Sequence, residues 1–357
     1  MNLAELFPDK PAGAYLDTAA VGLTPRPVAD RAAACYREYG GGVVAGVPER
    51  WQRVVDETAA TVARHFGTGH EVTFPAHTGE AMNALARAVD WAPGDEVLVL
   101  RDDYPSVVLP WTTLPGVSVV RADPLPGDDR TAALLAALTP ATRVVAVTHV
   151  NARTGTTVDL RALGTAAHAA GAALVVDGAQ GGGVAAADLT EVDAYVVTAY
   201  KWLLAGWGIA VLFTAPEFAA RLTPALVGHA NVPPSRRLRH GHVNLAGVYA
   251  LAAACEVRER IGPDRIRART AELTARLHAG GDDLGLPRFA PPERTSGIVS
   301  FDLGADADRV GRALAERDVT VAVRAGALRV SPYFYTADDE IDRFLAALAG
   351  ALAGSRS

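Results

Sequence analysis

An aspartate and a lysine follow two apolar runs that lie close together in the sequence. Asp177 lies in VVDGAQ (175–180), and Lys201 follows 24 residues later in TAYKW (198–202). In an open α/β sheet, ligands bind outside the carboxyl ends of the strands. If both runs are strands, the carboxylate and the amine face the same crevice.

Such a pair has a defined use in pyridoxal-phosphate (PLP) chemistry. A carboxylate keeps the pyridine nitrogen protonated, and a lysine amine forms an imine with the cofactor. Taken alone, a turn-capping aspartate and a surface lysine are the commoner interpretation. The pair becomes informative because other parts of a cofactor site follow in order.

Two further segments could complete such a site. HTGEAMNAL (77–85) places Thr78 and Gly79 at the start of a helical pattern, where backbone N–H groups can bind a phosphate. An ordinary N-cap with Glu80 in the first turn explains the same residues. Tyr104 follows the run EVLVL (96–100) and could lie over a cofactor ring, or could be a plain turn residue.

Recognition of a substrate carboxylate favours a planar, bidentate cation, and two arginines are candidates. Arg329 lies within the apolar segment ALRVSPYFYT (327–336), where an unpaired charge is costly. An ion pair with an acid of 338–340 is the structural alternative, and Arg324 is a second candidate for either role.

Short β-rich runs alternate with helical patterns, which indicates an α/β fold with a mostly parallel sheet covered on both faces. We expect a large PLP-binding domain of residues 20–250 and a small α+β domain of residues 1–19 and 251–357. The expected strands are 96–100, 143–150, 173–179, 194–199 and 208–214, and the expected helices include 78–90, 130–139, 160–170, 306–317 and 337–351.

Composition excludes several classes of function. The formal net charge of −6 is spread along the 357 residues without a basic run, so we expect no nucleic-acid partner. The two cysteines, Cys35 and Cys255, show no metal-ligand spacing and fit a reducing cytoplasm. No apolar run is long enough for a membrane span, and residues 1–16 do not have the pattern of a signal peptide.

Together these segments resemble the class V aminotransferase family of fold-type I PLP enzymes. The family includes cysteine desulfurases, selenocysteine lyase, C–S lyases and isopenicillin N epimerase. The resemblance begins at YLDTAA (15–20) and extends nearly to the C-terminus.

The resemblance implies roles for individual residues. Lys201 would hold PLP as a Schiff base, Asp177 would bind the pyridine nitrogen, and Gln180 would donate to the phenolic oxygen. Tyr104 would stack on the ring. The phosphate would be bound at Thr78, Gly79, Thr198 and Tyr200, where Tyr200 replaces the histidine of many relatives.

Two other segments carry implications from the same family. RHGHVNLAGVYAL (239–251) resembles a segment that crosses a dimer interface, which implies a homodimer with His242 or Asn244 near the partner subunit's phosphate. In THVNARTG (148–155), Ala152 occupies the usual asparagine position, and Asn151 is displaced by one residue. We therefore expect Asn151, in place of the usual asparagine, to contact the cofactor oxygen.

A further departure bears on the reaction. Cysteine desulfurases of this family carry a nucleophilic cysteine on a loop that RAGALRV (324–330) does not have. We therefore expect β-elimination from cysteine or an S-substituted cysteine, with Lys201 and possible assistance from Tyr104. The alternatives are an epimerase, an aminotransferase, an aldehyde-forming tailoring enzyme, or a non-catalytic PLP-binding relative. A Rossmann dehydrogenase is disfavoured because QGGGV (180–184) lacks the G-x-G-x-x-G spacing.

Overall fold

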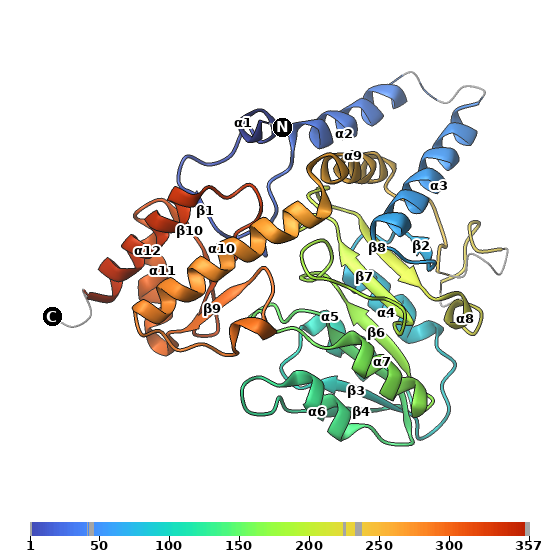
Figure 1. Cartoon of the computed structure of the whole chain (residues 1–357). Helices are drawn as coiled ribbons and strands as arrows, with labels where there is room; N and C mark the ends of the chain where they lie inside the picture. Colours follow the sequence, from blue (N-terminus) through green and yellow to red (C-terminus); the bar gives the residue numbers. More distant parts are fainter. Residues whose placement is uncertain (1, 41, 43–45, 224–225, 233–237, 354–357) are drawn as a thin grey trace.

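A computed structural model describes residues 2–40, 42, 46–223, 226–232 and 238–353. A seven-stranded sheet forms the centre of the larger part of the molecule (Figure 1). Its strand order is β2 (Glu71–Thr73), β8 (Ala210–Thr214), β7 (Ala194–Thr198), β6 (Ala173–Asp177), β5 (Thr142–Thr148), β3 (Glu96–Leu100) and β4 (Ser118–Ala122).

Only β8 runs against the other strands of this sheet, since β7 and β2 both pair with it in antiparallel register. The predicted mostly parallel sheet is therefore confirmed. Every residue of β6, β7 and β8 is buried, which explains why these strands are continuous apolar runs in the sequence.

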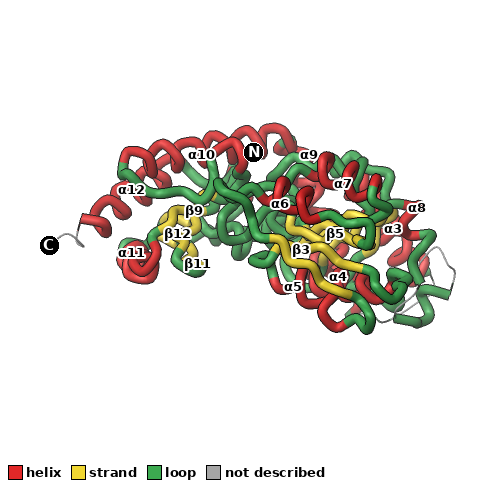
Figure 2. Tube along the Cα trace, turned by 90° about the horizontal axis from the view of Figure 1, so that it is seen from below, coloured by secondary structure: helices red, strands yellow, loops and turns green. Residues whose placement is uncertain are grey.

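Helices cover both faces of the sheet, as Figure 2 shows for β3 and β5. One face packs against α4 (Thr78–Ala88), α5 (Pro105–Val108), the 3₁₀ helix η1 (Leu109–Thr113) and α8 (Pro216–Ala219). The other face packs against α2 (Arg26–Tyr39), α3 (Val47–His65), α6 (Arg130–Ala137), α7 (Leu160–Ala169) and α9 (Leu245–Ile261).

The smaller part contains an antiparallel sheet in the order β11 (Ala322–Arg324), β12 (Ala327–Val330) and β9 (Val299–Asp302). Nearby, β1 (Ala14–Tyr15) pairs with β10 (Val319–Thr320). The remaining helices are α1 (Leu3–Leu6), α10 (Pro263–Asp283), η3 (Pro292–Arg294), η4 (Gly304–Asp306), α11 (Ala307–Ala315) and α12 (Asp338–Ala353).

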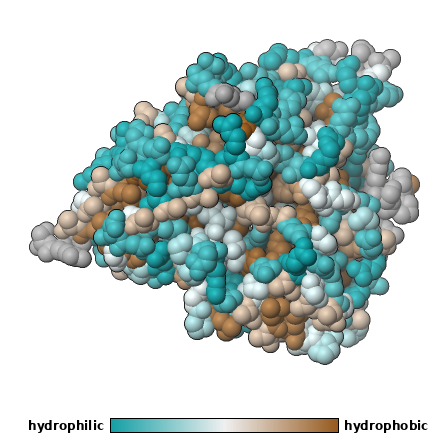
Figure 3. Space-filling view, viewed as in Figure 1, coloured by the Kyte–Doolittle hydropathy of each residue, from teal (hydrophilic) through white to brown (hydrophobic). Residues whose placement is uncertain are grey.

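The long helix α10 runs from the end of α9 to the smaller sheet (Figures 1 and 2). Its outer surface is largely hydrophilic (Figure 3), while Leu273 and Leu277 pack into the core of the smaller part. The domain boundary predicted at residue 250 falls within α9, whose buried side chains contribute to the core of the large sheet.

Among the described residues, no helix combines the length and the apolar character that a membrane crossing requires.

Candidate active site

Asp177 and Lys201 lie at the carboxyl edge of the large sheet. Asp177 is the last residue of β6, and Lys201 follows β7, the next strand in the sheet, by three residues. Each side chain changes the pKa of the other, so the acid and the amine share one site.

The carboxylate of Asp177 is almost completely buried, with 1% of its surface exposed. It accepts hydrogen bonds from the backbone N–H of Ala179 at 2.8 Å and from Ser106 Oγ at 3.4 Å. Burial raises the pKa of Asp177 to about 6, although Ala179 and the positive charge of Lys201 oppose the rise. Near neutral pH the group is therefore an anion ready to bind a protonated partner.

The pKa of Lys201 changes in the opposite direction. Burial lowers its pKa from 10.5 to about 8, the Asp177 carboxylate partly restores it, and the Arg329 guanidinium lowers it further. A larger fraction of this amine is therefore neutral and nucleophilic near neutral pH than in an ordinary lysine. Its Nζ atom lies 5.6 Å from the centre of the Tyr200 ring.

Gln180 follows Asp177 in a turn, and its amide orientation is fixed by two hydrogen bonds. Its Nε2 donates to the carbonyl of Ala19 at 2.9 Å, and its Oε1 accepts from Trp202 Nε1 at 2.9 Å. An amide nitrogen carries two hydrogens, so one N–H is left for a ligand oxygen.

Helix α4, whose first turn is the place predicted for a phosphate, lies beside β7. The N-cap is His77, which neither sequence interpretation used: its Nδ1 accepts from the N–H of Glu80 at 3.0 Å. Thr78 and Gly79 form the first turn. A Cβ atom on Gly79 would lie 3.3 Å from His77 Nδ1, so the absence of a side chain keeps this helix end open.

Thr198, the last residue of β7, has a buried hydroxyl that makes no hydrogen bond of normal geometry with the described residues. Burial raises the pKa of Tyr200, and the nearby Thr198 hydroxyl partly offsets the rise. A buried hydroxyl without a partner is costly unless a ligand satisfies it. Together with the open helix end, this donor set fits a phosphate group.

The ring of Tyr200 stacks on Trp207, with ring centres 3.9 Å apart and planes inclined by 13°. Trp207 is 64% exposed, and Tyr104, the N-cap residue of α5, is 52% exposed. Tyr104 lies close enough to Tyr200 and Arg329 to affect their pKa values. Tyr200, Trp207 and Tyr104 therefore form a group of aromatic side chains beside Lys201.

Arg329 is 3% exposed in β12 and reaches the site from the smaller part of the molecule. Its guanidinium donates to Asp17 Oδ1 and to the carbonyl of Ala152, both at 2.9 Å, while its buried Nε has no partner among the described residues. The suggested ion pair with an acid of 338–340 is wrong, since Asp338 pairs with Arg269 and Arg276 and Glu340 with Lys10. Those acids lie at the start of α12, where other cations reach them.

Arg324, the second arginine candidate, lies exposed at the end of β11. Its positive charge lowers the pKa of both Lys201 and Arg329, so it is close enough to contribute to an anion site.

Asn151 is buried, but its side-chain carbonyl oxygen is already hydrogen-bonded to the turn that follows it. Oδ1 accepts from the N–H groups of Arg153 and Thr154, both at 2.9 Å. Only the amide N–H groups of Asn151 are then left for a ligand.

The segment predicted to cross a dimer interface begins α9. Asn244 is the N-cap residue: it accepts from Gly247 N–H at 3.1 Å and donates to the Gly208 carbonyl at 3.0 Å. His242 is exposed, with its ring centre 4.7 Å from that of His229. Asn244 is thus occupied within its own chain, whereas His242 is exposed beside His229.

Sequence reasoning missed two residues that support the site. Ser106 contacts Asp177 directly, and the buried carboxylate of Asp103 accepts from the Thr148 backbone at 2.9 Å and from the Thr148 hydroxyl at 2.7 Å. Both flank Tyr104 in DDYPS, so polar residues at a strand's carboxyl end were the available signal.

The described chain has no thiol at this site. Cys35 lies buried in α2 and Cys255 in α9, and burial raises the pKa of Cys255 to about 12. A tight turn at Ala325 and Gly326 joins β11 to β12, so the hairpin has no long loop.

The chain matches the class-V aminotransferase family over residues 14–344. It is 29% identical to a probable cysteine desulfurase of Methanothermobacter thermautotrophicus over 87% of this chain and 83% of the relative. It is 32% identical to the isopenicillin N epimerase of Streptomyces clavuligerus over 75% of this chain and 77% of the relative.

The fold is shared with the cystine C–S lyase C-DES in complex with cysteine persulfide. The TM-score is 0.88 at 21% identity, covering 96% of this chain and 99% of the lyase. In another C-DES structure, a variant carries glycine covalently linked to its PLP cofactor.

Proposed function

Because this chain is a class-V aminotransferase family enzyme whose cofactor is PLP and whose substrates are amino acids, we propose that it is a C–S lyase. It would eliminate a sulfur leaving group from the β carbon of cysteine or an S-substituted cysteine, without a thiol of its own. When bound, the cofactor supplies an electron sink for the substrate's Cα carbanion.

In this proposal the two central residues have separate tasks. Lys201 attaches the cofactor and, once the substrate's amine has displaced it, removes the Cα proton. Its pKa of about 8 supports both tasks, because a neutral amine is both nucleophile and base. Asp177 holds the pyridine nitrogen protonated, which its buried carboxylate suits.

The other residues would orient cofactor and substrate. We assign Gln180 and Asn151 to the phenolic oxygen and Tyr104 to the ring face. The phosphate is assigned to Thr78, Gly79, Thr198 and Tyr200, with His242 contributed from the partner subunit. Arg329, assisted by Arg324, would bind the substrate carboxylate, and the unpartnered Nε of Arg329 supports this assignment.

The observation that carries the lyase proposal is the short β11–β12 hairpin together with the two buried cysteines. A sulfur relay needs a thiol that can reach the substrate sulfur. Cys35 and Cys255 lie within helices α2 and α9, and high thiol pKa values also oppose that role.

The test supplies the purified enzyme with several S-substituted cysteines and measures pyruvate, ammonia and thiol. We expect all three products from the wild type and from Cys35→Ala/Cys255→Ala, and none from Lys201→Ala. If the wild type releases none of them from any substrate, the lyase assignment is wrong.

The relation to isopenicillin N epimerase supports a second candidate, reprotonation of Cα on the opposite face. This activity would exchange the Cα hydrogen with solvent deuterium and give the D-amino acid without pyruvate. Chiral chromatography of the same reaction mixtures distinguishes it from elimination.

A further inference from the structure

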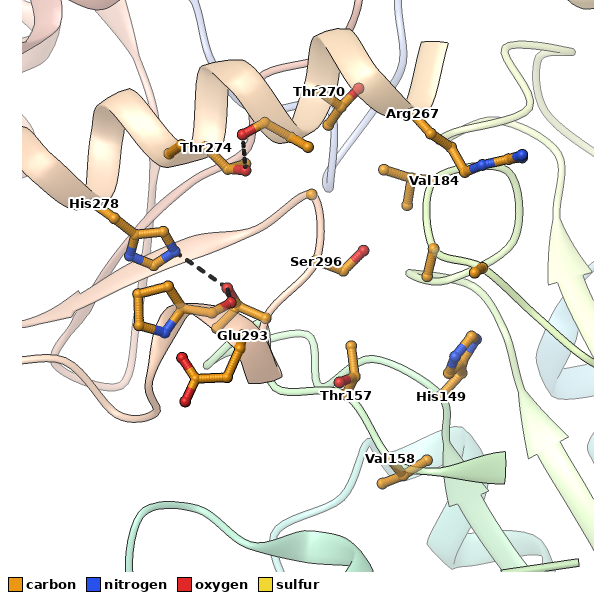
Figure 4. A pocket seen from close by; sticks show the side chains of 17 residues that line it. His149, Thr157, Val158, Val184, Arg267, Thr270, Thr274, His278, Glu293 and Ser296 are labelled. Atoms are coloured by element: carbon orange, nitrogen blue, oxygen red, sulfur yellow. Dashed lines mark hydrogen bonds between the residues drawn. The ribbon is translucent and has the colours of Figure 1, made fainter. Parts of the chain in front are cut away.

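A cavity lies at the carboxyl edge of the large sheet, on the opposite face from Asp177. Asp177 faces α5 through Ser106, whereas His149 faces the opposite side, where its Nδ1 hydrogen-bonds to Tyr195 Oη at 2.9 Å. The cavity has a volume of about 570 Å³ and lies between α10, the 292–297 segment and the residues after β5 (Figure 4). This size suits a small organic molecule.

Hydroxyl groups dominate the polar lining of this cavity. Thr270 Oγ1 donates to the Ile266 carbonyl at 2.8 Å, and Thr274 Oγ1 donates to the Ala271 carbonyl at 3.0 Å. Thr157 Oγ1 donates to the Arg294 carbonyl at 3.1 Å. Because these hydroxyl hydrogens are engaged, the oxygens offer lone pairs to the cavity. They would accept hydrogen bonds from hydroxyl or amino groups of a ligand.

One end of the cavity is strongly basic. Figure 4 shows Arg267 on α10 at the end of the cavity that is near Val184, opposite Glu293 and His278. Arg267, Ala185 and Ala186 also line an adjoining pocket of about 330 Å³.

The other polar residues of the adjoining pocket are Arg64, His65 and Arg258, and no described Asp or Glu lines it. Arg258 is 2% exposed, and its partners include the carbonyls of Gly183 at 2.8 Å and Trp202 at 3.0 Å rather than a carboxylate. Burial, with the charges of Arg258 and Arg267, lowers the pKa of His65 to about 4. Arg267 pairs with Asp264, which does not line the pocket, and no carboxylate of the described residues forms an ion pair with Arg64 or Arg258.

We propose that the two adjoining pockets form a second ligand site for a small organic anion that carries hydroxyl or amino groups. Its anionic group would lie at Arg64, Arg258 and Arg267, and its donor groups would face the threonines of α10. The inference does not depend on which reaction the cofactor site performs.

The test uses the PLP-loaded enzyme, so that the cofactor's own phosphate site is filled. Isothermal titration calorimetry would compare inorganic phosphate with 3-phosphoglycerate, which adds a carboxylate and a hydroxyl group. We expect saturable binding of both and tighter binding of 3-phosphoglycerate. If neither inorganic phosphate nor 3-phosphoglycerate binds saturably, the proposal is wrong.

Matched variants on one helix locate the binding. Arg267→Gln should weaken 3-phosphoglycerate binding by about 10-fold or more, as expected for losing a charge-assisted contact. Arg265→Gln removes the same charge from an exposed α10 position that does not line either pocket and should leave binding unchanged. Equal effects of the two variants would mean nonspecific attraction and would contradict the site; thermal denaturation verifies that both variants fold.

Discussion

At the level of single residues, the opposite shifts of Lys201 and Asp177 have one cause. Burial disfavours charge on both side chains, so the lysine pKa falls to about 8 and the aspartate pKa rises to about 6. Their mutual attraction limits both shifts. The carboxylate is therefore both a proposed ligand of the pyridine nitrogen and a control on the basicity of the amine.

This coupling predicts a pH dependence of cofactor attachment. Only the neutral Lys201 amine attacks the PLP aldehyde, so the rate of reattachment to the apoprotein should rise with pH through about 8 rather than 10.5. Asp177→Asn removes the charge that raises the lysine pKa, so the inflection should move to lower pH. Stopped-flow absorbance measures the pH profile of the wild type and of Asp177→Asn. The ionisation of free PLP affects both profiles equally, so it does not explain a difference between them. A shift to higher pH would contradict the coupling.

At the level of elements, the β11–β12 hairpin brings Arg324 and Arg329 toward the site. Its two connecting residues, Ala325 and Gly326, have φ values of 46° and 78°. Positive φ at both positions is typical of tight hairpin turns that match the strand twist. The short connection leaves no long loop between the two strands. It also fixes the register in which Arg329 pairs with Ala322.

We expect Gly326→Ala to lower the free energy of unfolding by about 1 kcal/mol, because an alanine at positive φ is strained. The added Cβ would also lie 3.3 Å from the backbone of Gly304. Gly350→Ala is the matched control: it lies exposed in α12 with open space and should raise stability by about 0.5–1 kcal/mol. Urea denaturation measures both. A stabilising Gly326→Ala would mean that the turn is not strained.

At the level of the whole molecule, we propose a homodimer with shared active sites. A partner would cover two exposed aromatic side chains near Lys201, Tyr104 and Trp207. His242 is exposed just before α9, in the segment proposed to cross the interface.

Subunit mixing tests this arrangement. Lys201→Ala should be inactive, and His242→Ala should be strongly impaired in PLP retention and activity. Mixed dimers would contain one intact site, so an equimolar mixture should recover about a quarter of wild-type activity if subunits exchange randomly. Sedimentation velocity should show twice the mass of the chain. A monomer, or a mixture without recovery, would contradict shared sites.

The sequence by itself determined the elements of the large sheet and the two central polar residues. Strands buried on both faces appear as continuous apolar runs, so the β6 and β7 regions were recognisable within one or two residues. Asp177 and Lys201 follow those runs, and the carboxyl edge of a parallel sheet brings such residues together. The missing cysteine loop was also readable, because it depends only on local spacing.

Only the tertiary structure decided the partners of these residues. Arg329 pairs with Asp17, and Gln180 bonds to Ala19 and Trp202, contacts that join segments far apart in the chain. The basic pocket likewise combines α3, α9 and α10. Local periodicity specifies which residues are buried, but their partners depend on how helices and sheets pack against one another. The sequence therefore predicted the chemistry proposed for Lys201, and the packing determined the surroundings of this side chain and the shift of its pKa.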